Sequence, residues 1–149
     1  MATYISHSAA ETAALGAAWG RDAQPGLVVA LSGELGAGKT ELVRGLAAGL
    51  DAPARVHSPS FTLLNIYSGG RLELYHIDLY RLDTPAQAVD AGLEEYLHTR
   101  GVTAIEWPEK WFGPDPAAAA RQFRLTMRWV QIEIVGHTER RIRYEDFGP

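Results

Sequence analysis

Apolar and polar residues follow two periods along this chain, which predicts a mixture of strands and helices. Short apolar or alternating runs, typical of strands, occur at residues 3–6, 27–31, 61–67, 71–77, 102–105, 123–128 and 131–135. Helices are expected at residues 8–19, 39–50 and 84–91, with a further turn or two at 93–98. Two of these helices open with a capping-box pattern, Ser8 with Glu11 and Thr84 with Gln87.

The order of these elements predicts the fold class. A strand, a glycine-rich loop and a helix come first, and a buried strand follows at residues 102–105, which favours an α/β fold. Residues 68–70 read Ser-Gly-Gly between two strands and predict a hairpin. We expect a three-layer domain with a central, mostly parallel sheet and additional antiparallel strands. No repeat, linker or shift in composition divides the chain, so residues 1–149 are predicted to form one domain.

The glycine-rich loop carries the strongest chemical signal. It reads Gly33-Glu34-Leu35-Gly36-Ala37-Gly38-Lys39-Thr40, which fits the phosphate-binding pattern G-x-x-x-x-G-K-[ST]. Glycines allow the backbone to approach phosphate oxygens, and the following helix presents its positive end to them. Lys39 would bind the β and γ phosphates, and the Thr40 hydroxyl would bind Mg²⁺. The only other lysine, Lys110, is expected to lie away from this loop.

A magnesium site at such a loop needs a second carboxylate from a neighbouring strand end. Glu106 follows the strand at 102–105, and Asp78 follows the strand at 71–77. Sequence alone leaves both open as the metal ligand. His76 alternates with Asp78 on one strand, so a metal pair is conceivable, although a solvated or hydrogen-bonded histidine is the simpler interpretation.

Arginines offer two further candidates. Arg81 is either an internal arginine finger or an ordinary surface residue. Arg140, Arg141 and Arg143 form a basic stripe that either contacts nucleic acid or marks a solvated strand edge, and we favour the strand edge.

Composition narrows the cellular setting. The chain has 149 residues, is 46% hydrophobic and contains no cysteine, which excludes disulfides and thiolate metal sites. Its formal net charge of −4 is unlike that of a free-standing nucleic-acid binder. The first 20 residues lack a basic segment followed by an apolar stretch, and no apolar run approaches the ~20 residues of a membrane span. We therefore expect a cytoplasmic protein that makes no membrane contact.

Three more segments follow the loop in a distinctive order. They read His-Ser-Pro-Ser-Phe-Thr-Leu at 57–63, His-Ile-Asp-Leu-Tyr-Arg-Leu at 76–82 and Ile-Glu-Trp-Pro-Glu at 105–109. With the loop, they strongly resemble the TsaE family, formerly called YjeE, whose members are small bacterial ATPases required for threonylcarbamoyladenosine formation on tRNA. One departure is Ser60, where the family pattern has threonine.

The resemblance implies a P-loop NTPase-like fold and specific roles for several residues. Thr40 and Glu106 would bind Mg²⁺, and Asp78 would lie by the attacking water. Residues 58–62, with Thr62 at the nucleotide, would form a switch-like segment near the γ-phosphate, and Trp107 would lie close to the nucleotide. ATP hydrolysis would reset an assembly with the TsaD and TsaB proteins, through which tRNA is mainly contacted.

Two other functions remain open from the sequence. Small P-loop proteins include kinases of small molecules, but such kinases usually carry an arginine-rich lid. Residues 106–120 contain no arginine, which counts against a lid there. The second alternative is a binding module that is gated by nucleotide without hydrolysing it.

Overall fold

The structure is a computed structural model that describes residues 1–53, 55–56 and 63–148. The predicted switch segment 58–62, including Thr62, lies outside the described residues.

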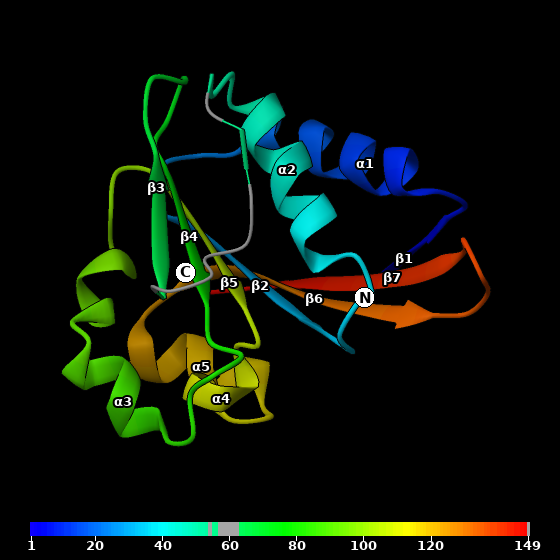
Figure 1. Cartoon of the computed structure of the whole chain (residues 1–149). Coiled ribbons are helices and arrows are strands. Elements are labelled where there is room, and N and C mark those ends of the chain that lie inside the picture. Colours follow the sequence, from blue (N-terminus) through cyan, green and yellow to red (C-terminus); the bar gives the residue numbers. More distant parts are fainter. Residues whose placement is uncertain (54, 57–62, 149) are drawn as a thin grey trace.

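The described residues form one sheet of seven strands (Figure 1), in the order β1-β7-β6-β2-β5-β4-β3. The four central strands, β6, β2, β5 and β4, run parallel, whereas β7, β1 and β3 pair antiparallel at the two sides. The strands are β1 (Ala2–Ser6), β2 (Leu27–Gly33), β3 (Leu64–Tyr67), β4 (Leu74–Asp78), β5 (Val102–Glu106), β6 (Thr126–Ile134) and β7 (Arg140–Phe147).

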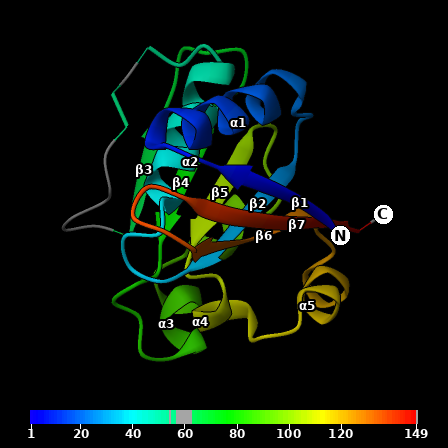
Figure 2. The same cartoon turned by 90° about the vertical axis from the view of Figure 1, so that its right-hand side faces the viewer.

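Helices cover both faces of the sheet, as Figure 2 shows, so the predicted three layers are present. One face carries α1 (Ala9–Asp22) and α2 (Lys39–Gly49). The other carries α3 (Pro85–Asp90), the 3₁₀ helix η1 (Leu93–Tyr96), α4 (Glu109–Phe112) and α5 (Pro116–Phe123). No helix in the described ranges combines the length and the apolar character that crossing a bilayer requires.

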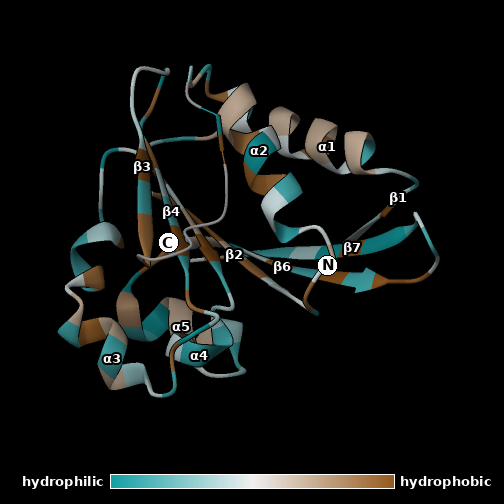
Figure 3. Cartoon of the chain, in the orientation of Figure 1, coloured by the Kyte–Doolittle hydropathy of each residue, from teal (hydrophilic) through white to brown (hydrophobic). Residues whose placement is uncertain are grey.

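The strand β2 is buried on both faces. Val29 and Leu31 belong to the hydrophobic core beneath α1 and α2, whereas Val28 and Ala30 belong to the core on the opposite face. This explains why the strand is apolar at every position from Leu27 to Leu31 rather than alternating. Figure 3 shows the contrast with β7, which is largely hydrophilic.

Helices α1 and α2 touch through their backbones at glycine positions. A Cβ atom added to Gly45 would lie 2.0 Å from the Ala13 carbonyl oxygen, and one added to Gly16 would lie 2.3 Å from that of Leu42. Both distances are far below van der Waals contact, so these positions require glycine at this helix spacing. Close packing holds α2, and therefore its amino end, in one place over the sheet.

Several predicted elements are confirmed. The hairpin of β3 and β4 forms, and the capping box of Thr84 with Gln87 is present. Ser8 caps α1 as expected, but the Glu11 carboxylate accepts from the His7 amide rather than from Ser8. Ser8 Oγ accepts from the Glu11 amide at 3.1 Å, and Gln87 Oε1 accepts from the Thr84 amide at 3.2 Å.

The prediction for the carboxyl-terminal third was wrong in three respects. Residues 123–128 and 131–135 were expected to be separate strands, but β6 is continuous from Thr126 to Ile134. No helix was expected between residues 105 and 123, but α5 is present: Pro116 occupies its first turn, where a missing amide costs nothing, and Asp115 caps the helix. The arginine segment at 140–143 is also not a sheet edge, because β7 is paired with both β1 and β6.

Gly45→Ala is expected to lower the free energy of unfolding by about 2 kcal/mol or more, because the added methyl group overlaps the backbone of α1. Helix propensity alone predicts the opposite, a gain of about 1 kcal/mol. The measurement is urea-induced unfolding followed by circular dichroism.

The matched control is Ala48→Gly on the exposed face of α2, which should cost only the propensity difference of about 1 kcal/mol. Unchanged or increased stability of Gly45→Ala would contradict the packing of α1 on α2.

Candidate functional site

The site lies where three parallel strands end at the same edge of the sheet. β2 ends at Gly33, β4 ends at Asp78 and β5 ends at Glu106. The strand register pairs Glu106 with Leu31 on one side and with Asp78 on the other. Ligands of open α/β sheets bind at such an edge.

The 33–40 loop joins β2 to α2 at this edge. Gly36 and Gly38 have φ angles of 80° and 113°, which side chains with a Cβ rarely adopt. The loop therefore needs glycine at both positions for a conformational reason. Helix α2 begins at Lys39, within the last two residues of this segment, so the amino-terminal N–H groups of the helix face the loop.

The Lys39 ammonium is folded into this loop. Its Nζ donates hydrogen bonds to the carbonyl oxygens of Gly33, at 2.6 Å, and Glu34, at 2.8 Å. Burial lowers the pKa of Lys39, while the nearby carboxylates of Glu106 and Asp78 act to raise it. An anion bound in the loop would replace the two carbonyl acceptors and favour the charged form of this lysine.

Glu106 is the central carboxylate of the site. Its side chain is buried, and its two oxygens lie 3.2 and 3.3 Å from the Thr40 hydroxyl, which donates to them. His76 Nε2 lies 2.6 Å from Glu106 Oε2, and His76 is fully buried. His76 Nδ1 finds no hydrogen-bond partner among the described residues. Because a carboxylate only accepts, the Nε2–H of His76 donates to Glu106 and helps to fix the carboxylate in place.

Asp78 lies beside this pair at the end of β4. Burial raises the pKa of its carboxyl group, and the charge of Glu106 adds to that effect. The Tyr80 amide donates to Asp78 Oδ1 at 3.0 Å and acts in the opposite direction. A half-buried carboxylate with a raised pKa is suited to accepting a proton.

Trp107 follows Glu106 and covers the loop lysine. Its φ angle is 61°, a left-handed conformation that is rare for a non-glycine residue. The Lys39 ammonium lies 4.3 Å from the centroid of the Trp107 ring, and the Tyr80 ring centroid lies 5.2 Å away. Lys110 lies 5.8 Å from the centroid of the same ring, so the second lysine is near the residue that covers Lys39.

The structure thus gathers most of the predicted residues. Lys39, Thr40, Glu106 and Trp107 are joined by direct contacts, and Asp78 is their neighbour in the sheet register. Arg81 is exposed, which fits the surface interpretation. No three acidic or histidine side chains form a metal cluster in the described part of the chain. A hydroxyl and one carboxylate nevertheless fit Mg²⁺, which commonly takes few protein ligands together with phosphate oxygens.

Sequence reasoning did not identify His76 as the partner of Glu106. Its period-2 relation to Asp78 was visible, but the contact depends on the parallel pairing of β4 with β5. The hydrogen-bonded interpretation of His76 is confirmed.

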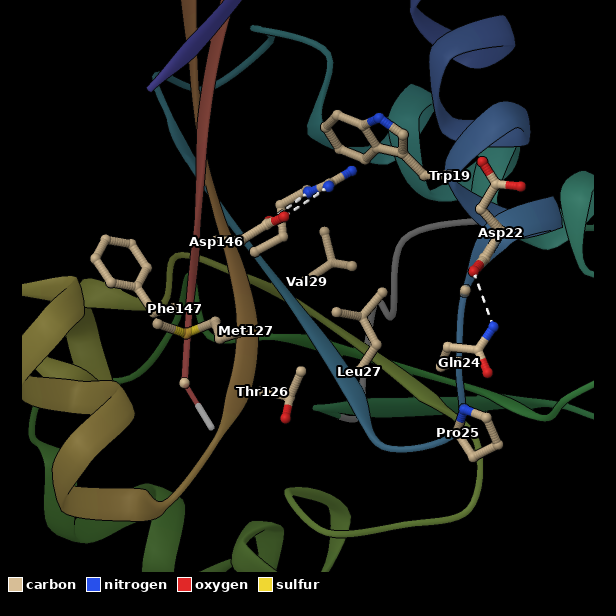
Figure 4. Close-up of a pocket in the computed structure, with 13 residues that line it drawn as sticks. Trp19, Asp22, Gln24, Pro25, Leu27, Val29, Thr126, Met127, Asp146 and Phe147 are labelled. Atoms are coloured by element: carbon tan, nitrogen blue, oxygen red, sulfur yellow. Dashed lines mark hydrogen bonds and ion pairs between the residues drawn. The ribbon is translucent and has the colours of Figure 1, made fainter.

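A second hollow lies at the opposite, amino-terminal ends of β2 and β6 (Figure 4), with a volume of about 410 Å³. Arg128 and Asp146 face each other there through hydrogen bonds of 2.7 and 2.9 Å. Arg128 also lies 4.8 Å from the ring centroids of Trp19 and Tyr144. Because its one arginine is paired with Asp146 and the remaining charged residue of its lining is Asp22, this hollow has a different chemical character from the loop site.

The sequence of this chain is similar to those of known proteins over most of its length. A family model described as "Threonylcarbamoyl adenosine biosynthesis protein TsaE" matches residues 6–142. A protein of that name from Treponema pallidum is 47% identical over 106 residues, covering 71% of this chain and 78% of the relative. The Bacillus subtilis protein is 44% identical over 97 residues, covering 65% of this chain and 60% of the relative.

A solved structure agrees with these matches. The crystal structure of YdiB from Bacillus subtilis superimposes with a TM-score of 0.75 at 32% identity, covering 96% of this chain and 83% of the other. Because the family model spans nearly the whole chain, this chain belongs to the TsaE family of threonylcarbamoyl adenosine biosynthesis proteins.

Proposed function

We propose that this chain binds ATP with Mg²⁺ in the 33–40 loop and hydrolyses it to support threonylcarbamoyladenosine formation on tRNA in the cytoplasm. The observation that carries the proposal is the hydrogen bond from the Thr40 hydroxyl to the Glu106 carboxylate at 3.2 Å, beside the loop lysine. The names of the relatives support the pathway. The geometry of the loop supports the binding of a nucleotide there.

The 33–40 loop would act as a P-loop. Glycine-rich turns let amide N–H groups surround phosphate oxygens, and α2 adds the positive end of its dipole. Lys39 would exchange its bonds to the Gly33 and Glu34 carbonyls for bonds to the β and γ phosphates. Trp107, which lies over Lys39, would then border the bound nucleotide.

Thr40 and Glu106 would hold the Mg²⁺ ion. Both offer oxygen atoms, the ligands that Mg²⁺ prefers, and His76 keeps the Glu106 carboxylate oriented. When bound, the ion neutralises negative charge that develops on the phosphates.

Asp78 would orient the attacking water and accept its proton. Its raised pKa and its position next to Glu106 in the strand register support this role. Its carboxylate is distinct from the one that contacts Thr40, so the two acidic residues divide into a metal ligand and a water-orienting group.

Hydrolysis would be weak without partners. Rapid phosphoryl transfer needs added positive charge at the γ-phosphate, which a partner can supply. Arg81 is exposed and therefore offers no fixed charge of that kind. We infer that the TsaD and TsaB proteins stimulate hydrolysis and that tRNA is reached mainly through them.

The kinase alternative has less support. The segment after Glu106 forms α4 and α5, and Trp111, Phe112, Ala119 and Ala120 are buried in the core. A segment packed in this way does not provide the mobile, arginine-rich lid of small-molecule kinases. A nucleotide-gated module without catalysis is distinguished from an ATPase by measuring turnover.

Lys39→Ala should weaken binding of Mg·ATP by about 10- to 100-fold, because a charge-assisted contact to two phosphates is lost. Isothermal titration measures the change. Arg21→Ala, in the exposed last turn of α1, removes one positive charge elsewhere and should leave affinity unchanged. Equal affinities for Lys39→Ala and wild type would remove the nucleotide site from this loop.

Glu106→Gln should weaken nucleotide binding in the presence of Mg²⁺, because it removes the metal's carboxylate. Asp78→Asn should keep that binding and lose most phosphate release. Titration calorimetry and a phosphate-release assay on both variants separate the two roles. The reverse pattern would show that the two carboxylates have exchanged roles.

Thermal unfolding gives an independent check on Asp78. Burial raises the pKa of Asp78 in the folded protein above its value in the unfolded chain. As pH rises from the unfolded pKa to the folded pKa, the free energy of unfolding therefore falls, and it stays lower at higher pH. Asp78→Asn should therefore melt at a higher temperature than wild type at pH 7, and the difference should vanish in acid. A lower melting temperature at pH 7 would contradict the assigned shift.

A further inference from the structure

Arg140 connects the β6–β7 hairpin to the glycine-rich loop. Its Nε donates to the Ala37 carbonyl oxygen at 3.0 Å, although the two residues are 103 positions apart. Its Nη1 donates to the carbonyl oxygens of Gly136 at 3.1 Å and Glu139 at 2.9 Å, both in the hairpin turn. One half-buried guanidinium group therefore holds two separate backbone segments.

The neighbouring arginines do not share this position. Side chains alternate along β7, so Arg140 lies on the face of Ile142, which packs in the core beneath α1 and α2. Arg141 lies on the opposite face and donates to Glu133 at 2.7 Å. The basic stripe seen in the sequence is thus distributed over both faces of the sheet, and Arg140 is the arginine that contacts the loop.

The bond to Ala37 has a directional consequence. The Ala37 carbonyl and the Gly38 N–H belong to one peptide group, and no described peptide is cis, so the two groups point in opposite directions. An Ala37 oxygen turned outward to Arg140 therefore turns the Gly38 N–H toward the inside of the loop. Gly38 has a φ of 113°, so this peptide would otherwise have wide rotational freedom.

We propose that Arg140 is a positioning residue that aims the Gly38 N–H at bound phosphate by holding the Ala37 carbonyl. The proposal rests on the proposed nucleotide site in the same loop. Arginine suits the role because its planar group carries several donors in fixed directions and can bond to the loop and the hairpin at once. Fixing the loop before binding reduces the ordering that the nucleotide must impose.

The test compares Arg140→Met, Arg140→Lys and the control Arg141→Met. Arg140→Met should weaken binding of Mg·ADP about tenfold, while Arg141→Met should bind as wild type does. Arg140→Lys keeps the charge but loses the planar fork, so its affinity should fall between those of wild type and Arg140→Met. Calorimetry with Mg·ADP measures all three without requiring turnover. Wild-type affinity in Arg140→Met would overturn the proposal.

Hydrogen exchange in the nucleotide-free protein gives a readout that is independent of binding. The Ala37 amide donates to the Glu34 carbonyl within the loop at 3.0 Å. Its exchange should be faster in Arg140→Met than in wild type and unchanged in Arg141→Met, at equal melting temperatures. Unchanged exchange in Arg140→Met would overturn the role of Arg140 even if nucleotide binds.

If wild type fails to bind nucleotide, the proposed function fails, and the exchange measurement still decides whether Arg140 holds the loop. Should Arg140→Met not fold, Arg140→Lys carries the same two comparisons.

Discussion

The buried carboxylate of Glu106 is the constraint on which the rest of the site depends. A charged group that is 3% exposed must be bonded, because an unpaired buried charge is strongly unfavourable. Thr40 from the start of α2 and His76 from β4 supply those bonds. The carboxylate thus ties the glycine-rich loop, the helix after it and two neighbouring strands to one point. The parallel register that brings β2, β4 and β5 to the same edge makes this possible.

The same arrangement explains the contacts of the loop lysine. The Lys39 ammonium uses the loop's own carbonyl groups as acceptors and lies against the Trp107 ring. These contacts satisfy the hydrogen-bond donors of the buried lysine. In the proposed function, phosphate oxygens would replace the carbonyl groups as acceptors. On the other side of the loop, Arg140 holds the Ala37 carbonyl, so the loop is supported from the hairpin as well as from the helix.

Local patterns predicted most of the front half of the chain, including the glycine-rich loop between β2 and α2. The motif at 33–40 depends on residues adjacent in sequence, as do the capping patterns that begin α1 and α3. The contacts that could not be predicted depend on strand pairing. The contact of His76 with Glu106 and that of Arg140 with Ala37 join residues 30 and 103 positions apart. The helix α5 was missed because Pro116 has the same local signature in a loop and in a first helical turn.

The central claim is that nucleotide chemistry at Glu106, Thr40 and Lys39 drives repeated tRNA modification. The most direct measurement is threonylcarbamoyladenosine synthesis with purified TsaD and TsaB, ATP and an excess of tRNA, with and without this chain. The account predicts that product continues to form beyond one round only when the wild-type chain is present, and that the Lys39→Ala chain stops near the first round. Equal product over many rounds with and without the chain would contradict the account.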